Sequence, residues 1–358
     1  FLSKECLSNG CIGTVDVSYP SVPLYLMYAP ELVKGMMRPI FKFAQMPVWN
    51  YDFAPHDVGR YPYATGQVYG RNDTEKIGKI GSDGVYPPYY AFPENSGVYK
   101  LEDQMPVEEC GNMLIMAAAV SIVEGSAGFA LKHRKLLEQW VGYLLRYGAD
   151  PGEQLCTDDF AGHFPHNVNL AAKAVMGVEA YSILMRMGDD PTQAGIYHRA
   201  AERLAESWAK RARSEGHTRL VFDSPDGWSM KYNLVWDILF DSGLFPKSLY
   251  KQEIKWYIEK ENAYGVPLDS RKAYTKSDWI LWCVAMAEEK ADREALIEPL
   301  GRYLRETPSR TPFSDWYSTV TAKEESFQNR TVQGGLFMPM LKEKFIATHA
   351  CGLRSGSK

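Results

Sequence analysis

Two pairs of neighbouring acids, Glu108-Glu109 and Asp158-Asp159, are the residues of this sequence best suited to catalysis. Each pair stands at or shortly before the start of an apolar stretch, where the positive end of a helix dipole favours a carboxylate. One acid in such a place commonly caps a helix, but two adjacent acids exceed what capping needs. Paired carboxylates act as general acid and general base when their surroundings separate their pKa values. We therefore predict that Glu108, Glu109, Asp158 and Asp159 are catalytic.

Two histidines stand near acids in loops that contain glycine: His56, next to Asp57, and His163, which follows Gly162. Each can act as acid or base, donate to a substrate or bind a metal. A single loop histidine more often forms only hydrogen bonds, and no C-x-x-C pair indicates a zinc site. We therefore expect no metal and no cofactor, and we predict that His56, Asp57 and His163 bind substrate.

Aromatic residues beside acids are the third feature, at Trp236-Asp237, Asp278-Trp279 and Asp315-Trp316. Aromatic walls next to carboxylates suit a sugar ring or another compact polar ligand, so Trp236, Asp278 and Trp279 are predicted binding residues. For Asp278 and Asp315, helix capping is the simpler explanation.

Arg271 is also a predicted binding residue, because a guanidinium can hold a substrate carboxylate with two hydrogen bonds. An internal ion pair with Asp269 explains it equally well. No nucleophile motif stands out. The sequence has no G-x-S-x-G elbow, and Ser248-Leu249-Tyr250-Lys251, which fits S-x-x-K, opens an amphipathic stretch where the match is fortuitous.

The elements that must position these residues are helices of two alternating kinds. A helix that is apolar on all sides has to be buried, whereas an amphipathic one lies at a surface. Apolar stretches begin near residues 18, 108, 166, 233, 276 and 331, and amphipathic ones cover 31–45, 128–147, 191–213, 246–262 and 291–306. Proline 39 predicts a kink in the first amphipathic helix.

Six buried and five amphipathic helices predict an all-α fold, an α/α toroid of six helical hairpins whose inner ring is wrapped by an outer ring. A plain helical solenoid is the alternative, but a closed ring accounts better for helices that are apolar on every side. The sixth outer helix would lie upstream of Phe1. In a toroid, the loops that enter the inner helices meet at one mouth, where the acids would gather.

Two segments depart from this pattern. Residues 47–104 combine many Gly and Pro residues with Trp49 and eight tyrosines, which predicts a long ordered loop of the kind that usually carries function. Residues 217–232 predict a short β-hairpin around Ser224-Pro225-Asp226-Gly227.

Composition excludes several classes of protein. The 358 residues include 40 basic and 44 acidic ones without a basic tract, so nucleic acid is not an expected partner. We identify no stretch that spans a membrane, and six scattered cysteines do not form a disulfide scaffold. The expected partner is a small-molecule substrate.

Several long blocks in fixed order resemble the glutaminase A family in its six-helical-hairpin domain. They include Pro55-His56-Asp57-Val58-Gly59, Met105-Pro106-Val107-Glu108-Glu109-Cys110-Gly111-Asn112-Met113, Leu155-Cys156-Thr157-Asp158-Asp159-Phe160-Ala161-Gly162-His163, Lys231-Tyr232-Asn233-Leu234-Val235-Trp236-Asp237, Tyr264-Gly265-Val266-Pro267-Leu268-Asp269-Ser270-Arg271, Tyr274-Thr275-Lys276-Ser277-Asp278-Trp279 and Ser314-Asp315-Trp316. The resemblance covers almost the whole chain. It implies a fold similar to the six-hairpin glycosidases.

The resemblance also implies a domain organisation, an activity and a location. It predicts a toroid domain over residues 1–345, a tail over 346–358, and an upstream β-sandwich region in the full-length protein. Fungal members are named for hydrolysing L-glutamine to glutamate and ammonia. For this protein the resemblance implies a secreted or periplasmic location.

Three functions are therefore open. The first is a glutaminase-like hydrolase. In it, one acid of the Glu108-Glu109 pair and one of the Asp158-Asp159 pair act as acid and base on a bound water, while Arg271 and His163 hold the polar ends of the substrate. The second is a glycoside hydrolase that uses the same carboxylates, with Trp236 and Trp279 as sugar platforms. The third is a carbohydrate- or peptide-binding module without turnover.

Overall fold

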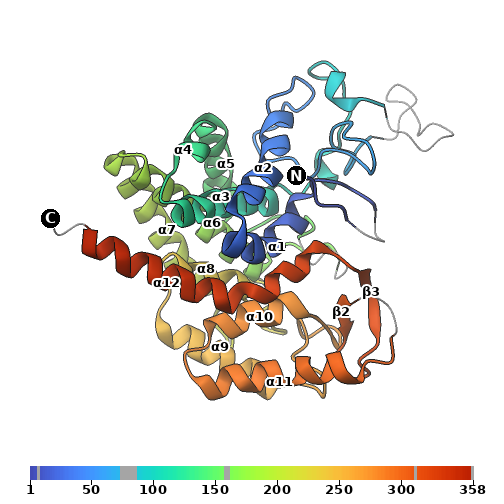
Figure 1. The fold of residues 1–358 in the computed structure, drawn as a ribbon, viewed down its shortest axis with the longest axis vertical. Coiled ribbons are helices and arrows are strands. Elements are labelled where there is room, and N and C mark those ends of the chain that lie inside the picture. Colours follow the sequence, from blue (N-terminus) through green and yellow to red (C-terminus); the bar gives the residue numbers. More distant parts are fainter. Residues whose placement is uncertain (6–8, 73–86, 157–161, 310–312, 356–358) are drawn as a thin grey trace.

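In a computed structural model of the chain, helices form an inner ring surrounded by outer helices (Figure 1). The structure describes residues 1–5, 9–72, 87–156, 162–309 and 313–355.

The inner ring is closed by contact between its first and last elements. Each element packs on the next around the ring, and η5 packs back onto α1. The elements are α1 (Val15–Tyr28), α3 (Pro106–Glu124), α6 (Val168–Met187), η4 with α8 (Tyr232–Leu234, Val235–Leu239), α10 (Ser277–Met286), and η5 with α12 (Thr331–Phe337, Met338–Ser355). The closure confirms the predicted toroid over the open solenoid.

Each outer helix follows an inner one and covers it. The outer helices are α2 (Pro30–Phe43), α5 (Arg134–Tyr147), α7 (Pro191–Ala212), α9 (Lys247–Glu259) and α11 (Lys290–Glu306). Helix α2 packs on α1 and α3, α5 on α3 and α6, α7 on α6, and α11 on α9 and α10. The predicted helix over 128–147 is interrupted, with the short α4 (Gly128–Leu131) preceding α5.

Helices α3 and α6 both match a membrane-spanning helix in length and hydropathy. Their place in the fold explains the match. In α3 every residue from Pro106 to Ser121 is buried, and in α6 every residue from Val168 to Met185. A core helix enclosed on all sides needs this composition.

Regular strands lie outside the predicted hairpin. Strands β1 (Tyr274–Lys276), β2 (Ser314–Ser318) and β3 (Glu324–Gln328) form an antiparallel sheet in the order β1-β2-β3. The register pairs Thr275 with Tyr317 and Ser314 with Gln328. Within 217–232 the described contacts are isolated bridges, such as that between Arg219 and Trp228.

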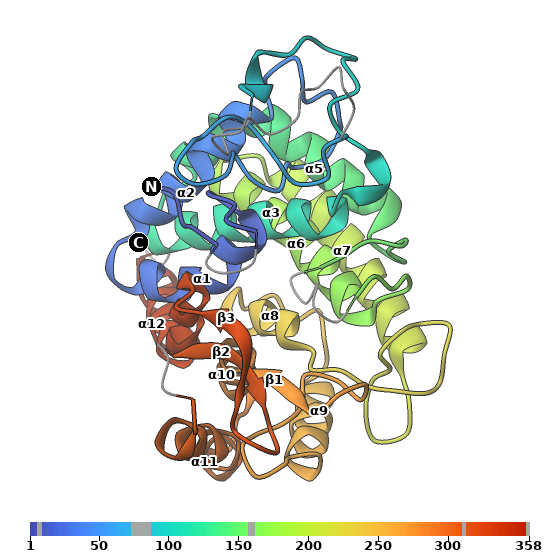
Figure 2. The same ribbon diagram turned by 90° about the vertical axis from the view of Figure 1, so that its right-hand side faces the viewer.

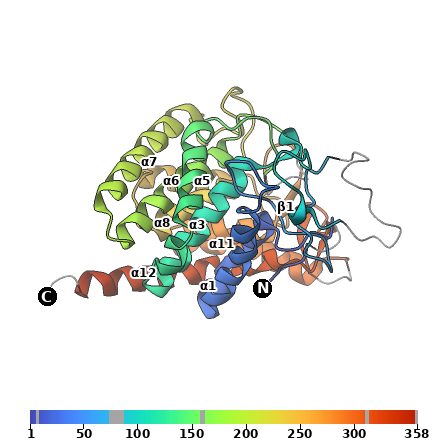
Figure 3. The same ribbon diagram turned by 90° about the horizontal axis from the view of Figure 1, so that it is seen from above.

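The irregular segment that follows α2 lies at one end of the molecule, opposite α9 and α11 (Figure 2). As predicted, its described part is ordered around aromatic contacts. The Trp49 ring packs edge-on against Tyr51, Phe53 and Tyr99. Helix α12 runs along one side of the ring and continues beyond it (Figure 3), across the position where we expect the tail to begin.

Candidate active site

Three polar side chains from distant parts of the sequence meet where α1 and α3 begin. Asp16 lies in the first turn of α1, His56 in the irregular segment and Glu109 in the first turn of α3. All three are buried, and one nitrogen or oxygen of each lies within 4.8 Å of the others. The His56 Nε2 atom is 3.5 Å from Asp16 Oδ1. We call these three residues the mouth cluster.

His56 is held in one orientation from both sides. Its Nδ1 is 3.0 Å from Asp57 Oδ2, and its ring stacks on Tyr69 with centroids 4.1 Å apart. Asp57 in turn accepts backbone N–H hydrogen bonds from Gly59, Val68 and Tyr69, at 2.9, 3.0 and 3.1 Å. These contacts direct Nε2 of His56 towards the other two members of the cluster.

The doubled acids Glu108 and Glu109 have different surroundings. Glu108 forms a buried ion pair with Lys173 of α6, and Asn112 donates to Glu108 at 3.2 Å and to Glu109 at 3.0 Å. The second oxygen of Glu109, Oε1, is buried and has no hydrogen-bond partner among the described residues. Of the two, Glu109 is the acid that belongs to the mouth cluster.

Burial and neighbouring charges act in opposite directions on this cluster. Burial by itself lowers the pKa of His56, but the carboxylates of Asp16, Asp57 and Glu109 raise it to about 10. The pKa of Glu109 is raised well above its ordinary value, first by burial and then by Asp16. A histidine and a glutamate that both hold a proton more tightly than usual are suited to moving protons.

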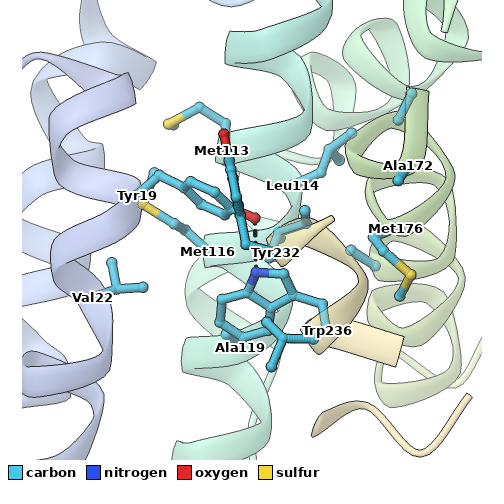
Figure 4. Close-up of a cluster of buried hydrophobic side chains, with 14 of the residues drawn as sticks. Tyr19, Val22, Met113, Leu114, Met116, Ala119, Ala172, Met176, Tyr232 and Trp236 are labelled. Atoms are coloured by element: carbon cyan, nitrogen blue, oxygen red, sulfur yellow. Dashed lines mark hydrogen bonds between the residues drawn. The ribbon is translucent and has the colours of Figure 1, made fainter. Parts of the chain in front are cut away.

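Inside the ring, Tyr19, Tyr232 and Trp236 pack among apolar side chains of α3 and α6 (Figure 4). The Trp236 indole donates to the Tyr19 hydroxyl at 2.8 Å, and Tyr19 donates to Asn233 at 2.8 Å. Trp279 stacks on Tyr232 with centroids 3.8 Å apart. Trp236 and Trp279 are both fully buried, so their prediction as binding platforms is wrong: their ring faces are already covered by the protein.

Asp278 belongs to a second buried cluster, which forms where α10 begins. Lys276 donates to Asp278 at 3.2 Å and lies 3.6 Å from Asp315. Arg330 binds Asp315 at 2.6 Å and Glu5 at 3.0 Å. Neither aspartate caps a helix through a hydrogen bond, which corrects the simpler explanation. Burial raises the pKa of Asp278 to about 6, although the positive charge of Lys276 opposes the rise.

Arg271 is engaged within the protein. Its Nη2 lies 2.6 Å from Asp269 Oδ2 and its Nε donates to Asp269 Oδ1 at 3.0 Å. The guanidinium also lies 4.5 Å from the ring centroid of Phe164. The internal ion pair with Asp269, which the sequence left open, is therefore the observed arrangement.

His163 is exposed and lines an open polar cavity of about 320 Å³ together with Tyr69, Arg71, Lys100 and Asp103. Tyr69 joins this cavity to the mouth cluster, because the same residue stacks on His56 and donates to Asp57. The predicted catalytic residues Asp158 and Asp159 lie outside the described residues.

The structure also adds residues that the sequence prediction missed. Asp16 has the same signal as Glu109, an acid in the first turn of an apolar helix, but it stands alone. Lys173 is a single lysine inside an apolar helix, and a fully buried lysine usually requires a paired acid. Asn112 follows Glu108 by four residues on the same helix face, the spacing at which side chains meet.

Comparison with known sequences yields one consistent group of relatives. A family model for the glutaminase A six helical-hairpin domain matches residues 1–340. Glutaminase A of Aspergillus oryzae is 32% identical over 342 residues, covering 93% of this chain and 45% of the relative. A probable glutaminase of Arthroderma benhamiae is 26% identical over 400 residues, covering 95% and 46%. The chain therefore spans under half the length of these relatives.

Among solved structures, a bacterial glucoamylase crystallised with acarbose is similar, with a TM-score of 0.56. The similarity covers 92% of this chain and 48% of the glucoamylase chain at 8% sequence identity. At this level of identity the similarity concerns the fold alone. It agrees with the closed double ring of helices.

Proposed function

Because this chain belongs to the glutaminase A six helical-hairpin family, we propose that it is a hydrolase that cleaves the side-chain amide of L-glutamine. The observation that carries the proposal is the convergence of Asp16, His56 and Glu109 where two inner helices begin. Relatives named glutaminase support glutamine as the substrate. Glu108 has a structural role in this proposal, because its charge is balanced by Lys173.

The proposed reaction consumes one water and releases glutamate and ammonia. A carboxylate of the mouth cluster takes a proton from water while the water oxygen attacks the amide carbon. The carbon–nitrogen bond then breaks, and the leaving nitrogen receives a proton from the cluster. Asp16 and Glu109 are the two acids in reach of one imidazole, so we assign the proton transfers to these three side chains.

The polar cavity beside Tyr69 is the proposed binding site for the other end of glutamine. Arg71 supplies positive charge for the α-carboxylate, and Lys100 and Asp103, which lie 3.6 Å apart in the same cavity, would exchange this contact for the α-carboxylate and the α-amino group. Tyr69 lies between this cavity and His56. This role replaces Arg271, which is bound to Asp269.

The test compares the release of ammonia from L-glutamine with the release of sugar from a panel of glycosides. We expect ammonia release by the wild type, a loss of at least about 100-fold in Glu109→Gln, and no change in Glu206→Gln on the exposed face of α7. Arg71→Gln should raise KM more than it lowers kcat.

Three results would contradict the proposal. Sugar release without ammonia release would support the glycoside hydrolase, for which the carboxylates of the mouth cluster are also suitable. Wild-type activity in Glu109→Gln would exclude the assigned site. Ligand binding without turnover in the wild type would indicate a binding module.

A further inference from the structure

We propose that Asp16, His56 and Glu109 together bind one divalent metal ion of the Zn²⁺ class. The three residues are far apart in the sequence, so no short sequence motif identifies them as metal ligands. This inference rests on the same cluster as the proposed function. It is tested through metal binding, so the two can fail separately.

The spacing of the side chains fits ligands of a shared ion better than hydrogen-bonded partners. The His56 Nε2 atom is 3.5 Å from Asp16 Oδ1, whereas a charge-assisted hydrogen bond is about 2.7–2.9 Å long. Two ligands held about 2.1 Å from a tetrahedral zinc ion are about 3.4 Å apart. With the candidate atoms of all three residues within 4.8 Å of one another, one ion reaches each of them after small shifts.

Glu109 provides the second, independent observation. Its side chain is 1% exposed, and within the part of the chain that the structure describes Oε1 has no hydrogen-bond partner. A buried carboxylate oxygen without a partner is costly. The other oxygen accepts from Asn112 at 3.0 Å, which fixes the orientation of the carboxylate. A bond from Oε1 to a metal would satisfy the remaining oxygen.

His56 has the supporting contacts that metal-binding histidines usually have. A ligating imidazole commonly donates its other N–H to a carboxylate, which fixes the ring. Here Nδ1 of His56 meets Asp57 at 3.0 Å, and Asp57 is itself fixed by three backbone N–H groups. This arrangement leaves Nε2 as the ligand atom, from which the metal would displace the proton.

The charge and chemistry of the ligand set indicate the class of ion. Asp16, Asp57 and Glu109 surround a single imidazole, and the neighbouring lysine, Lys173, is paired with Glu108. A divalent cation would offset this excess of negative charge. One nitrogen and two carboxylates suit Zn²⁺ or Mn²⁺, whereas Ca²⁺ takes six to eight oxygen ligands. Three protein ligands leave a position for water, as in catalytic zinc sites.

The experiment uses protein stripped with EDTA and then titrated with ZnCl₂ by calorimetry, with the bound metal counted by mass spectrometry. We expect one zinc per chain in the wild type and in Glu206→Gln. Glu109→Gln and Asp16→Asn should lose this zinc while keeping the wild-type circular dichroism spectrum. Asp57→Asn keeps all three ligands, and it should weaken zinc binding about 10- to 100-fold.

Failure of the folded wild type to bind one zinc would overturn the inference, as would unchanged affinity in Glu109→Gln. Preferential binding of CaCl₂ over ZnCl₂ would overturn the assigned class of ion. Stoichiometric zinc binding without ammonia release would support this inference and contradict the proposed substrate.

Discussion

At the scale of single residues, the neighbouring acids Glu108 and Glu109 have different surroundings. Substituting one or the other should therefore change the stability of the protein by different amounts. Glu108→Gln leaves the fully buried Lys173 without its ion-pair partner, and removing one partner of a buried pair costs about 3–5 kcal/mol. Glu109→Gln removes a carboxylate whose Oε1 accepts no hydrogen bond from any residue that the structure describes, so we expect the unfolding free energy to change by no more than about 1 kcal/mol. Urea unfolding in EDTA measures both variants.

The two substitutions are matched in chemistry, position and burial, so each serves as the control for the other. Equal destabilisation by both would show that Glu109 is held by contacts as strong as those of Glu108. That result would contradict the distinction on which the mouth cluster rests.

Asp278 offers a pH-dependent prediction. Burial raises its pKa to about 6 in the folded protein, with Lys276 opposing the rise, against about 3.9 in an unfolded chain. The folded state therefore binds more protons than the unfolded state between pH 4 and 6. The contribution of Asp278 to the unfolding free energy therefore falls as the pH rises from 4 to 6. Above pH 6 the ionised carboxylate destabilises the folded protein by the full amount.

Asp278→Asn should remove this dependence. The unfolding free energy of the variant minus that of the wild type should rise by about 2–3 kcal/mol from pH 4 to pH 7. Urea unfolding over this range at constant ionic strength measures the difference. A pH-independent difference would show that Asp278 is ionised throughout.

Single residues were the part of the site that the sequence predicted least completely. The sequence does identify the doubled acids and the His56-Asp57 pair, because the members of each pair are adjacent in the chain. Asp16 and Lys173 became part of the site only through their partners on other helices. Which acid of Glu108-Glu109 is paired depends on the position of α6, and sequence periodicity does not contain that information.

At the scale of elements, α3 and α6 approach closely at a glycine on each helix. A Cβ on Gly177 would lie 2.5 Å from Leu144 and 3.3 Å from the Cα of Gly111. Gly177→Ala should therefore destabilise the protein by about 1–3 kcal/mol through overpacking. Gly142→Ala in the outer helix α5 meets only Arg146, at 3.8 Å, and should stabilise by up to about 1 kcal/mol through helix propensity.

Thermal or urea unfolding of the two alanine variants tests the opposite signs. A stabilising Gly177→Ala would mean that the crossing of α3 and α6 tolerates wider spacing. The neighbouring Gly111→Ala would meet the Lys173 side chain at 2.7 Å and would also disturb the Glu108 ion pair. Gly177 therefore isolates the packing effect better.

The alternation of apolar and amphipathic stretches is sufficient to predict the paired helices. A helix that is apolar on all sides has to be buried, and an amphipathic helix has to keep one face exposed. The sequence does not predict the sheet, because its strands are three to five residues long and β1 pairs with β2 across the whole of α10 and α11. Such short strands lack a clear alternating pattern. The turn signal in 217–232 is real, but the flanking residues form isolated bridges.

At the scale of the whole molecule, the defining contact is the closure between α1 and η5. This contact joins elements more than 300 residues apart, and it is reinforced by the Arg330–Glu5 ion pair and by hydrogen bonds from Lys344 to the backbone of Leu26 and Met27. Closure keeps the starts of α1 and α3 together, and with them Asp16 and Glu109. The mouth cluster depends on the ring being closed.

Gly334 in η5 tests this dependence. A Cβ at this position would lie 2.3 Å from the backbone oxygen of Ser21 and 3.1 Å from Leu24 in α1. A backbone oxygen inside a helix cannot move aside as a side chain does, so Gly334→Ala should force η5 away from α1. We expect hydrogen exchange to become faster in α1 and α12, with little change in α6 and α7, which contact each other on another part of the ring.

Gly301→Ala in the outer helix α11, whose nearest contact is Arg305 at 3.2 Å, is the matched control and should leave exchange unchanged. If closure holds the mouth cluster together, Gly334→Ala should also weaken zinc binding, although Gly334 contributes no ligand. Faster exchange around the whole ring would instead mean that the toroid unfolds as one cooperative unit. Unchanged exchange in α1 would show that the contact with η5 does not hold this helix in place.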